Sequence, residues 1–332
     1  MRRQSGQTLA LIVVFMMAIL GMAAFAIDAG SWYQARRAAQ ASADASALAG
    51  AGQLPAGWST ALTTATSEFN SNKKTGDTAA YQNTTTNSSN DTVKVTVTRP
   101  ASFFFTKIFG FSNRNITATA SATVLSYTKV VSTGQVMPWA IMKNSFVLGQ
   151  AYSIYVDNST PNNGAVSLPI KNSSGTCSAT SGANDYNNSI IGPPTGNAVC
   201  DVSVGEVVPV KTGQNTGPTK QGIDNRITSW DPISAIVQFT SNGQAIVLKP
   251  DSPQLVIIPI VEDMSGGTTF PSGSGNVRVV GFAFFVLTQP GYTQGGKQVL
   301  GTFVGLQTTN SAWQTGAWAP GANTAYTVQL TN

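Results

Sequence analysis

The chain has 332 residues, of which 42% are hydrophobic and 10% charged, and its net charge is +5. This apolar share is enough for a folded core, and the scattered cations form no basic stripe with interleaved aromatic residues, so we expect no nucleic-acid binding. The sequence has no histidine, which is the commonest general base and metal ligand, and we therefore expect no enzymatic activity, cofactor or metal site.

The first element in the chain is an apolar run of 19 residues, Leu9–Ile27, which ends at Asp28. As a helix rising about 1.5 Å per residue it would be ~28 Å long, close to the hydrocarbon thickness of a bilayer. We predict a transmembrane helix over residues 8–28, with Trp32 and Tyr33 in the aromatic belt at the far headgroups. A cleaved secretory signal is the alternative, but its apolar region should span only about 7–15 residues.

The orientation of this predicted anchor depends on charges and cysteines. Arg2 and Arg3 favour a cytoplasmic N-terminal tail over residues 1–7, although Arg36-Arg37 on the other side weakens the bias. The chain has only two cysteines, and both lie in one polar region: Cys177 and Cys200. Such an isolated pair suits a disulfide in an oxidising compartment, with two unrelated buried thiols as the alternative. We expect a single-pass protein of the cell membrane whose C-terminal part is extracytoplasmic.

An alanine-rich segment follows and predicts that the helix continues from about Thr8 to Ala51. Three polar residues spaced by four share one helix face and can support each other: Arg36, Gln40 and Asp44. The other faces carry mostly alanine and serine, including Ala45 and Ala49, and small residues let helices approach closely. Two interpretations stay open, and they are compatible: contact with partner helices, or packing on the chain's own globular domain.

The elements expected next make a small α+β domain over residues 29–130. They are a helix at Trp58–Asn70, a polar loop at 71–91, a strand at Thr92–Thr98 ended by Arg99-Pro100, a helix at Ser102–Phe109 stopped by Gly110, and a strand at Ile116–Val124.

Residues 131–332 predict a second, mainly β domain that contains the Cys177–Cys200 pair. Its expected strands are Tyr152–Val156, Ala165–Ile170, Gln254–Val261, Val277–Leu287, Val299–Leu306 and Ala325–Leu330. Pro218 is well placed to begin a helix that runs to about Thr228. The predicted fold class is therefore α+β: a transmembrane helix continuing into a small α+β domain, then a mainly β domain.

Three patterns could carry chemistry, and a structural interpretation is favoured for the first two. Gly213–Lys220 resembles a phosphate-binding loop but has the wrong spacing, so we interpret it as a loop that enters a helix. Glu262-Asp263 could form a paired acid site, but a solvated strand end is the favoured interpretation. A serine–lysine nucleophile pair is the remaining route to catalysis.

The N-terminal segment resembles the TadE/TadG-like family of the tight-adherence (Flp) pilus machinery. The resemblance is carried by Gly6-Gln7-Thr8, Ala26-Ile27-Asp28-Ala29-Gly30, Tyr33, Arg36, Arg37, Gln40, Ala43-Asp44-Ala45 and Ala47-Leu48-Ala49-Gly50-Ala51. The strand–helix–strand over Val93–Val124 also fits, and Met137–Ile141 and Gly217–Gly222 are similar to segments of larger TadG-like members. The resemblance implies a single-pass envelope protein that assists assembly or anchoring of a thin pilus, with membrane lipid and other Tad proteins as partners.

Two departures from the family pattern limit what the resemblance implies. Pilin-like members have glutamate five residues after a processing-site glycine, whereas Gly6 is followed at that distance by Leu11. Some TadG members carry an Asp-x-Ser-x-Ser metal-binding adhesion motif, and the nearest match, Asp201–Gly205, lacks the second serine. A surface adhesin or minor pilin that contacts the cell wall or a host surface is the alternative. An envelope hydrolase is a third hypothesis, disfavoured by the missing histidines.

Overall fold

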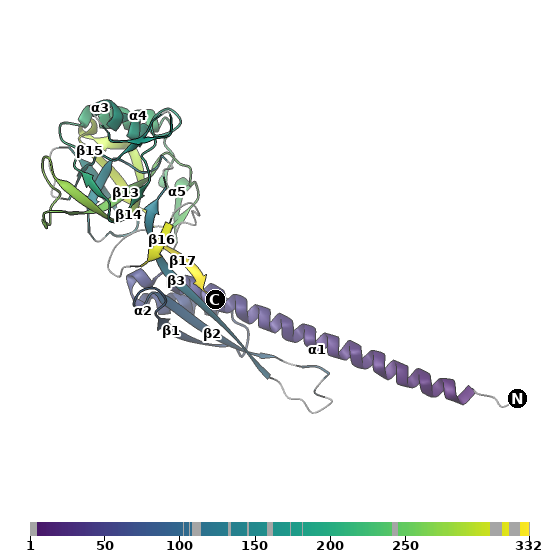
Figure 1. Cartoon of the computed structure of the whole chain (residues 1–332). Coiled ribbons are helices and arrows are strands. Elements are labelled where there is room, and N and C mark those ends of the chain that lie inside the picture. Colours follow the sequence, from purple (N-terminus) through teal and green to yellow (C-terminus); the bar gives the residue numbers. More distant parts are fainter. Residues whose placement is uncertain are drawn as a thin grey trace. The chain divides into compact units, whose positions relative to one another are not determined.

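The structure is a computed structural model that divides into two compact units, Met1–Thr123 with Gln329–Asn332, and Val124–Val328. It describes residues 5–101, 103–105, 107, 114–131, 134–144, 146–157, 162–172, 174–180, 182–240, 245–305, 314–318 and 326–331. The fold class is α+β, as the sequence predicted: a long apolar helix, an α+β region and a β-rich C-terminal part (Figure 1).

The first unit is built around one unbroken helix, α1 (Ser5–Ala51), which confirms the expected helix to Ala51. The segment contains no proline and is rich in alanine, the residue with the highest helix propensity. A 3₁₀ turn at Leu54–Ala56 follows α1 and reverses the chain, and α2 (Trp58–Asn72) then packs against α1.

Small residues form the contact between α1 and the rest of the first unit. The fully buried side chains are Ala39, Ala43 and Ala47 from α1, Ala61 and Ala65 from α2, and Val93, Val95 and Val97 from β2. A Cβ atom placed on Gly50 would lie 2.9 Å from the Ala65 Cβ and 3.2 Å from the Val93 Cγ1. This alanine face of α1 therefore packs on the chain's own domain, which is one of the two interpretations that the sequence left open.

Three antiparallel strands of a six-stranded sheet cover the helices: β1 (Thr78–Thr84), β2 (Thr92–Ala101) and β3 (Arg114–Val130). In β2 and β3 the buried valines and alanines alternate with polar residues and pair across the strands, for example Val93 with Ala122 and Val97 with Ala118. These two strands confirm the expected ones. β3 begins in the first unit and ends in the second.

Strand β1 lies within residues 71–91, so the expected loop there was wrong. Its sequence alternates only weakly, and it forms because β2 supplies a full set of backbone hydrogen-bond partners. Two buried aspartates bracket it. Asp77 pairs with the Arg99 guanidinium at 2.5 Å, and the Asp91 carboxylate accepts from three backbone N–H groups of residues 86–88.

Hydrogen bonds to the two carboxylates set the direction of their pKa shifts. Burial by itself would raise the pKa of each carboxyl, but the hydrogen bonds from Arg99 to Asp77 and from the loop amides to Asp91 outweigh it and lower both pKa values. Strand β2 continues past the expected stop at Arg99-Pro100 to Ala101, because its pairing with β3 extends to Ala101 opposite Arg114. Half of the expected helix at 102–109 lies outside the described residues, and Phe103–Phe105 are not helical.

The second unit contains a seven-stranded sheet in the order β5-β15-β14-β13-β4-β6, with β10 also paired to β14. Its strands are β4 (Trp139–Met142), β5 (Ala151–Val156), β6 (Asn163–Ala165), β10 (Val207–Pro209), β13 (Leu255–Asp263), β14 (Asn276–Thr293) and β15 (Gln298–Phe303). The central strands β13 and β14 are nearly continuous apolar runs because both sheet faces are covered by hydrophobic clusters.

Shorter elements complete this unit. They are β7 (Ile170–Lys171), β8 (Cys177–Ser178), β9 (Val202–Ser203), β11 (Val237–Phe239), β12 (Ala245–Val247), β16 (Gln314–Ala317), β17 (Tyr326–Thr331), the 3₁₀ turn Gln294–Gly296, and the helices α3 (Gly182–Ile191), α4 (Thr216–Arg226) and α5 (Ile233–Ile236). The last three residues of β17, from Gln329 to Thr331, belong to the first unit.

Most expected strands of the second unit are confirmed, with two corrections. Only the ends of Ala165–Ile170 are in strands, β6 and β7. Helix α3 was not predicted, because its Gly/Asn-rich sequence has low helix propensity and is held by packing against α4 (Figure 1). The Trp139 Nε1–H donates to the Tyr186 hydroxyl at 2.7 Å, and that hydroxyl lies 3.0 Å from the Thr219 hydroxyl, so one buried chain of hydrogen bonds joins sheet, α3 and α4.

We predict that Gly50→Leu destabilises the first unit by about 1–3 kcal/mol, because the larger side chain overpacks the contact with α2 and β2. Thermal unfolding of the detergent-solubilised full chain measures the effect. Gly30→Leu is the matched control on the same helix, since a Cβ at Gly30 meets nothing within 4 Å. Equal melting temperatures for the two variants would contradict the prediction.

Candidate membrane anchor and disulfide region

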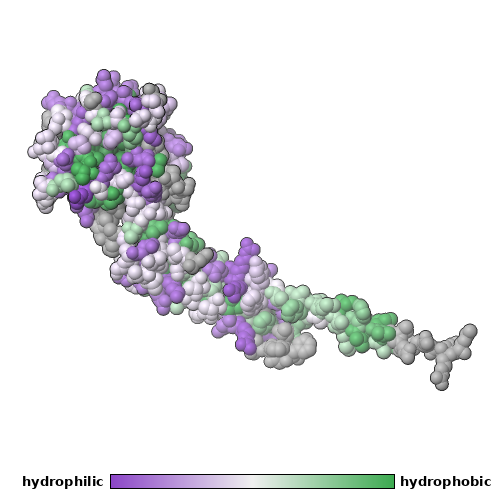
Figure 2. All heavy atoms as spheres, viewed as in Figure 1, coloured by the Kyte–Doolittle hydropathy of each residue, from purple (hydrophilic) through white to green (hydrophobic). Residues whose placement is uncertain are grey.

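The N-terminal half of α1 exposes a continuous apolar surface. The large hydrophobic side chains from Leu9 to Ile27 are between 45% (Val13) and 72% (Phe25) exposed. Figure 2 shows these residues as a hydrophobic stretch of helix surface. By length and composition α1 could cross a membrane, and its apolar window has no buried part. A surface of this size left in water would be strongly unfavourable, so a lipid environment is the physically consistent one.

The character of α1 changes at Asp28, one residue after the apolar run. Asp28 is only 2% exposed, and its carboxylate accepts hydrogen bonds from the backbone N–H of Phe104 at 2.8 Å and of Phe105 at 3.1 Å. Trp32 and Tyr33, the residues predicted for the aromatic belt, follow about one turn later and are exposed. The sequence analysis did not find the contact between Asp28 and the chain after β2, because 76 residues separate the partners.

The residues predicted for helix packing lie in three different environments. The Gln40 side chain donates to the Asp44 carboxylate at 2.8 Å and to the Thr119 carbonyl at 3.2 Å, so it links α1 to β3. The Arg36 guanidinium lies 5.8 Å from the centre of the Trp32 ring. Ala45 and Ala49 are half-buried, on the flank of the alanine face.

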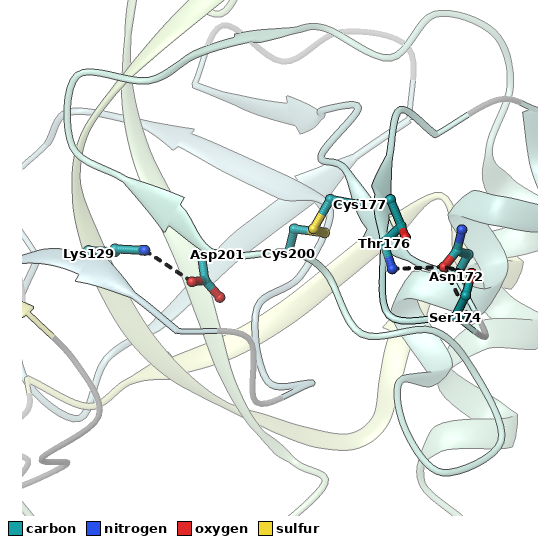
Figure 3. The surroundings of a disulfide bond; sticks show 7 residues. All are labelled: Lys129, Asn172, Ser174, Thr176, Cys177, Cys200 and Asp201. Atoms are coloured by element: carbon teal, nitrogen blue, oxygen red, sulfur yellow. Dashed lines mark hydrogen bonds and ion pairs between the residues drawn. A yellow bond between two sulfur atoms is a disulfide. The ribbon is translucent and has the colours of Figure 1, made fainter.

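The structure joins Cys177 and Cys200 in a disulfide, which excludes the alternative of two unrelated thiols (Figure 3). Cys177 is in strand β8 of a short hairpin with β7, and Cys200 is buried. The Asn172 side-chain oxygen closes the hairpin turn by accepting from the backbone N–H groups of Ser174 and Thr176. The disulfide therefore fastens an exposed hairpin to the buried segment at Cys200.

An ion pair continues this fastening on the other side of Cys200. Asp201 lies 3.1 Å from the Lys129 ammonium, and Lys129 belongs to β3 (Figure 3). Both side chains are about one-third exposed, so we expect a small contribution to stability from the pair itself. Its structural effect is to link the segment at Cys200, to which the disulfide attaches the β7–β8 hairpin, to the C-terminal end of β3. Asp201 thus has a structural partner in this arrangement.

The second unit also holds a cavity of about 370 Å³ between β5, β6 and the loops at 210–215 and 270–273. Its two charged lining side chains both bind the protein. The Asp157 carboxylate accepts from the Asn215 N–H and the Thr216 hydroxyl at the start of α4, where a negative charge is favourable. The Lys211 ammonium donates to the Gly182 carbonyl at 3.1 Å. These hydrogen bonds hold the two charged side chains of the cavity wall in fixed positions.

The patterns that could carry chemistry are structural where the chain is described. Glu262 forms an exposed ion pair with Arg278 at 3.3 Å, whereas Asp263 accepts from the amides of Ser265 and Gly267 in the turn after β13. The hydrogen bonds from Ser265 lower the pKa of Asp263. Helix α4 begins inside Gly213–Lys220, as expected for a loop that enters a helix. Within the described ranges no group of three or more Cys, Asp or Glu side chains is placed to hold a metal ion.

Comparison with known proteins assigns the N-terminal segment. Residues 6–53 match the family model described as putative Flp pilus-assembly TadE/G-like. The match confirms the resemblance of this segment to TadE/G-like Flp pilus-assembly proteins, and that family is one of pilus assembly rather than of catalysis. No curated protein and no solved structure matches the chain.

We predict that replacing the disulfide by Cys177→Ser/Cys200→Ser destabilises the second unit by about 3 kcal/mol, since the unfolded chain gains the entropy of an open loop. For a unit of this size the expected drop in melting temperature is about 6–12 °C. Calorimetry of the full chain before and after reduction measures it. Ser178→Ala, an exposed change in the same strand, is the control. A reduced protein that melts at the same temperature as the oxidised one would contradict the prediction.

Proposed function

We propose that this protein is a membrane-anchored extracytoplasmic structural protein that assists assembly or anchoring of a Flp/Tad-type pilus. The observation that carries the proposal is the division of the TadE/G-like segment into two environments within one helix. Its first half exposes an apolar surface from Leu9 to Ile27, and its second half is built into a folded domain through Ala39, Ala43 and Ala47.

An unbroken helix suits a structural role because it couples its two ends mechanically. At about 1.5 Å per residue, the 47 residues of α1 span about 70 Å. Because the helix interior has no proline and its C-terminal half is packed on α2 and β2, the folded domain and the apolar run move together. A protein of this design can hold a partner at a set height above the membrane without any catalytic group.

The proposed topology places residues 1–7 in the cytoplasm and the chain after Asp28 outside it. Arg2 and Arg3 favour the cytoplasmic side for the N-terminus. The Cys177–Cys200 disulfide fits an oxidising compartment for the second unit. Membrane lipid and other Tad proteins are the proposed partners.

The second candidate is a surface adhesin or minor pilin, in which the β-rich unit contacts the cell wall or a host surface. The cavity beside β5 and β6 favours a binding role for this unit, because its wall is held in place by Asp157 and Lys211. Both candidates share the anchor and the fold, and they differ in where the intact protein resides. An envelope hydrolase finds no support in the described residues, where the cavity's charged groups are used for structure.

The location of the full-length protein tests the proposal. We expect a C-terminally tagged chain to stay in the membrane fraction after surface filaments are sheared from cells, and deletion of the protein to abolish the filaments. A helix with this apolar length is retained by the bilayer, and Gly6 lacks the glutamate of a pilin processing site. Recovery of the protein in the sheared filaments would contradict the assembly role and favour the minor pilin.

A second test concerns the partner surface, which we place at Ala45 and Ala49. These half-buried residues lie one helical turn apart beside the packed face, so a partner helix could approach α1 closely there. We expect Ala45→Trp to abolish co-purification with other Tad proteins while the melting temperature of the second unit stays unchanged. Ser59→Trp, an exposed change on α2, is the control. Unaltered co-purification of the Ala45→Trp variant would contradict the assignment of the partner surface to Ala45 and Ala49.

A further inference from the structure

Strand β2 runs along α1 toward the apolar run. Three contacts at successive levels of the helix show this direction: Gly50 with Val93, Gln40 with Thr119 (β3, paired to Thr96), and Asp28 with Phe104. As the residue number in α1 decreases from 50 to 28, the residue number of its partner in and after β2 increases from 93 to 104. The chain that leaves β2 therefore arrives beside α1 where its apolar run ends.

A buried carboxylate fixes the position of this arriving chain. Asp28 accepts from both the Phe104 and the Phe105 backbone N–H groups, and a carboxylate removed from water needs such donors. Asp28 directly follows Ile27, the last residue of the apolar run. The backbone of Phe104 and Phe105 is thus held at the level where the apolar surface of α1 stops.

The side chains held there are apolar and exposed. Phe104 is 66% exposed and Phe105 is 38% exposed, although neighbouring backbone atoms of both are engaged by the buried Asp28. Trp32 and Tyr33 of α1 add two more exposed aromatic rings about one turn above Asp28. Lys107, two residues after Phe105 in the sequence, is also exposed. Aromatic rings with nearby cations are the composition of a membrane–water interface.

We propose that Phe104 and Phe105 insert into the headgroup–acyl boundary of the same bilayer that α1 spans, as a second membrane contact of the first unit. The inference rests on the spanning of the membrane by α1 in the proposed function. Its occupant is lipid because the two rings continue the exposed apolar surface of Leu9–Ile27 at its outer end. Two contacts from one rigid unit would set the tilt and rotation of α1, which a single spanning helix leaves free.

The experiment compares three labelled positions in the full chain reconstituted into phosphatidylcholine–phosphatidylglycerol vesicles. Because Cys177 and Cys200 are joined, an introduced cysteine is the one free thiol. Phe104→Cys carries an aromatic-sized bimane dye at the proposed contact. Leu20→Cys reports insertion of α1, and Ser89→Cys, exposed in the β1–β2 connection, reports the aqueous side.

Each label is quenched separately by brominated acyl chains and by aqueous iodide. We expect the dye at position 104 to shift its emission to shorter wavelength on reconstitution, to be quenched by brominated lipid and to lose its quenching by iodide. The dye at position 20 should be quenched by brominated lipid, and the dye at position 89 by iodide alone. This pattern would support insertion of the aromatic residues.

Other patterns overturn the inference in distinguishable ways. A dye at position 104 that stays open to iodide, while the dye at position 20 is quenched by brominated lipid, contradicts the second contact and leaves the anchor intact. Protection of position 104 from both quenchers would mean that a protein surface or a second copy covers it, which also contradicts insertion. A dye at position 20 that brominated lipid does not quench would overturn the membrane anchor and the inference together.

Discussion

The close approach of α1 to α2 and β2 is the constraint on which the first unit depends. At Gly50 there is no room for a Cβ atom between Ala65 and Val93, and the alanines one and two turns earlier are fully buried. Helices that meet through alanine and glycine bring their backbones near, so the packing gains many weak dispersion contacts over a short distance. Larger side chains at these positions would push α1 away from α2 and β2, and the apolar run would then no longer be held rigidly by the folded part of the first unit.

The surface of the same helix changes character along its length. Up to Ile27 the side chains are large, apolar and exposed, which suits hydrocarbon. From Ala39 onward they are small and buried against protein. Between these zones lies Asp28, whose buried carboxylate accepts hydrogen bonds from the Phe104 and Phe105 amides. This residue connects the end of the anchor to the hairpin of the folded unit, and the proposed membrane contact follows from that connection.

The second unit is stabilised in a different way from the first, by a β-rich core with few charged residues. Its central strands β13 and β14 are apolar on both faces and are covered by two hydrophobic clusters. The polar periphery is held by specific links: the disulfide to Cys200, the Asn172 turn and the hydrogen-bond chain from Trp139 through Tyr186 to Thr219. These links fix hairpins and helices whose own sequences have weak structural preference. The cavity lined by Asp157 lies in this periphery, and the hydrogen bonds of Asp157 to the start of α4 hold its wall in place.

The elements with strong local patterns could be predicted from the residues alone. The apolar run, the alanine-rich continuation and the alternating strands at Val93 and Ile116 could be predicted because each pattern has the period of its own secondary structure. The family resemblance over the first helix could also be recognised, since its residues are contiguous. Strand β1 and helix α3 could not be predicted, because partners elsewhere in the chain hold them: β2 for the strand, and α4 for the helix.

The contacts made by the faces of α1, in contrast, depend on long-range packing. Alanine spacing is compatible with a partner helix or with the chain's own domain, and the burial of Ala39, Ala43 and Ala47 places that face in the domain core. The pairing of Asp28 with the Phe104 and Phe105 amides was likewise invisible in the sequence, since a single carboxylate after an apolar run has no local signature of its acceptor role. Long-range contacts depend on where the chain returns in space, and that return is fixed by the packing of all the elements together.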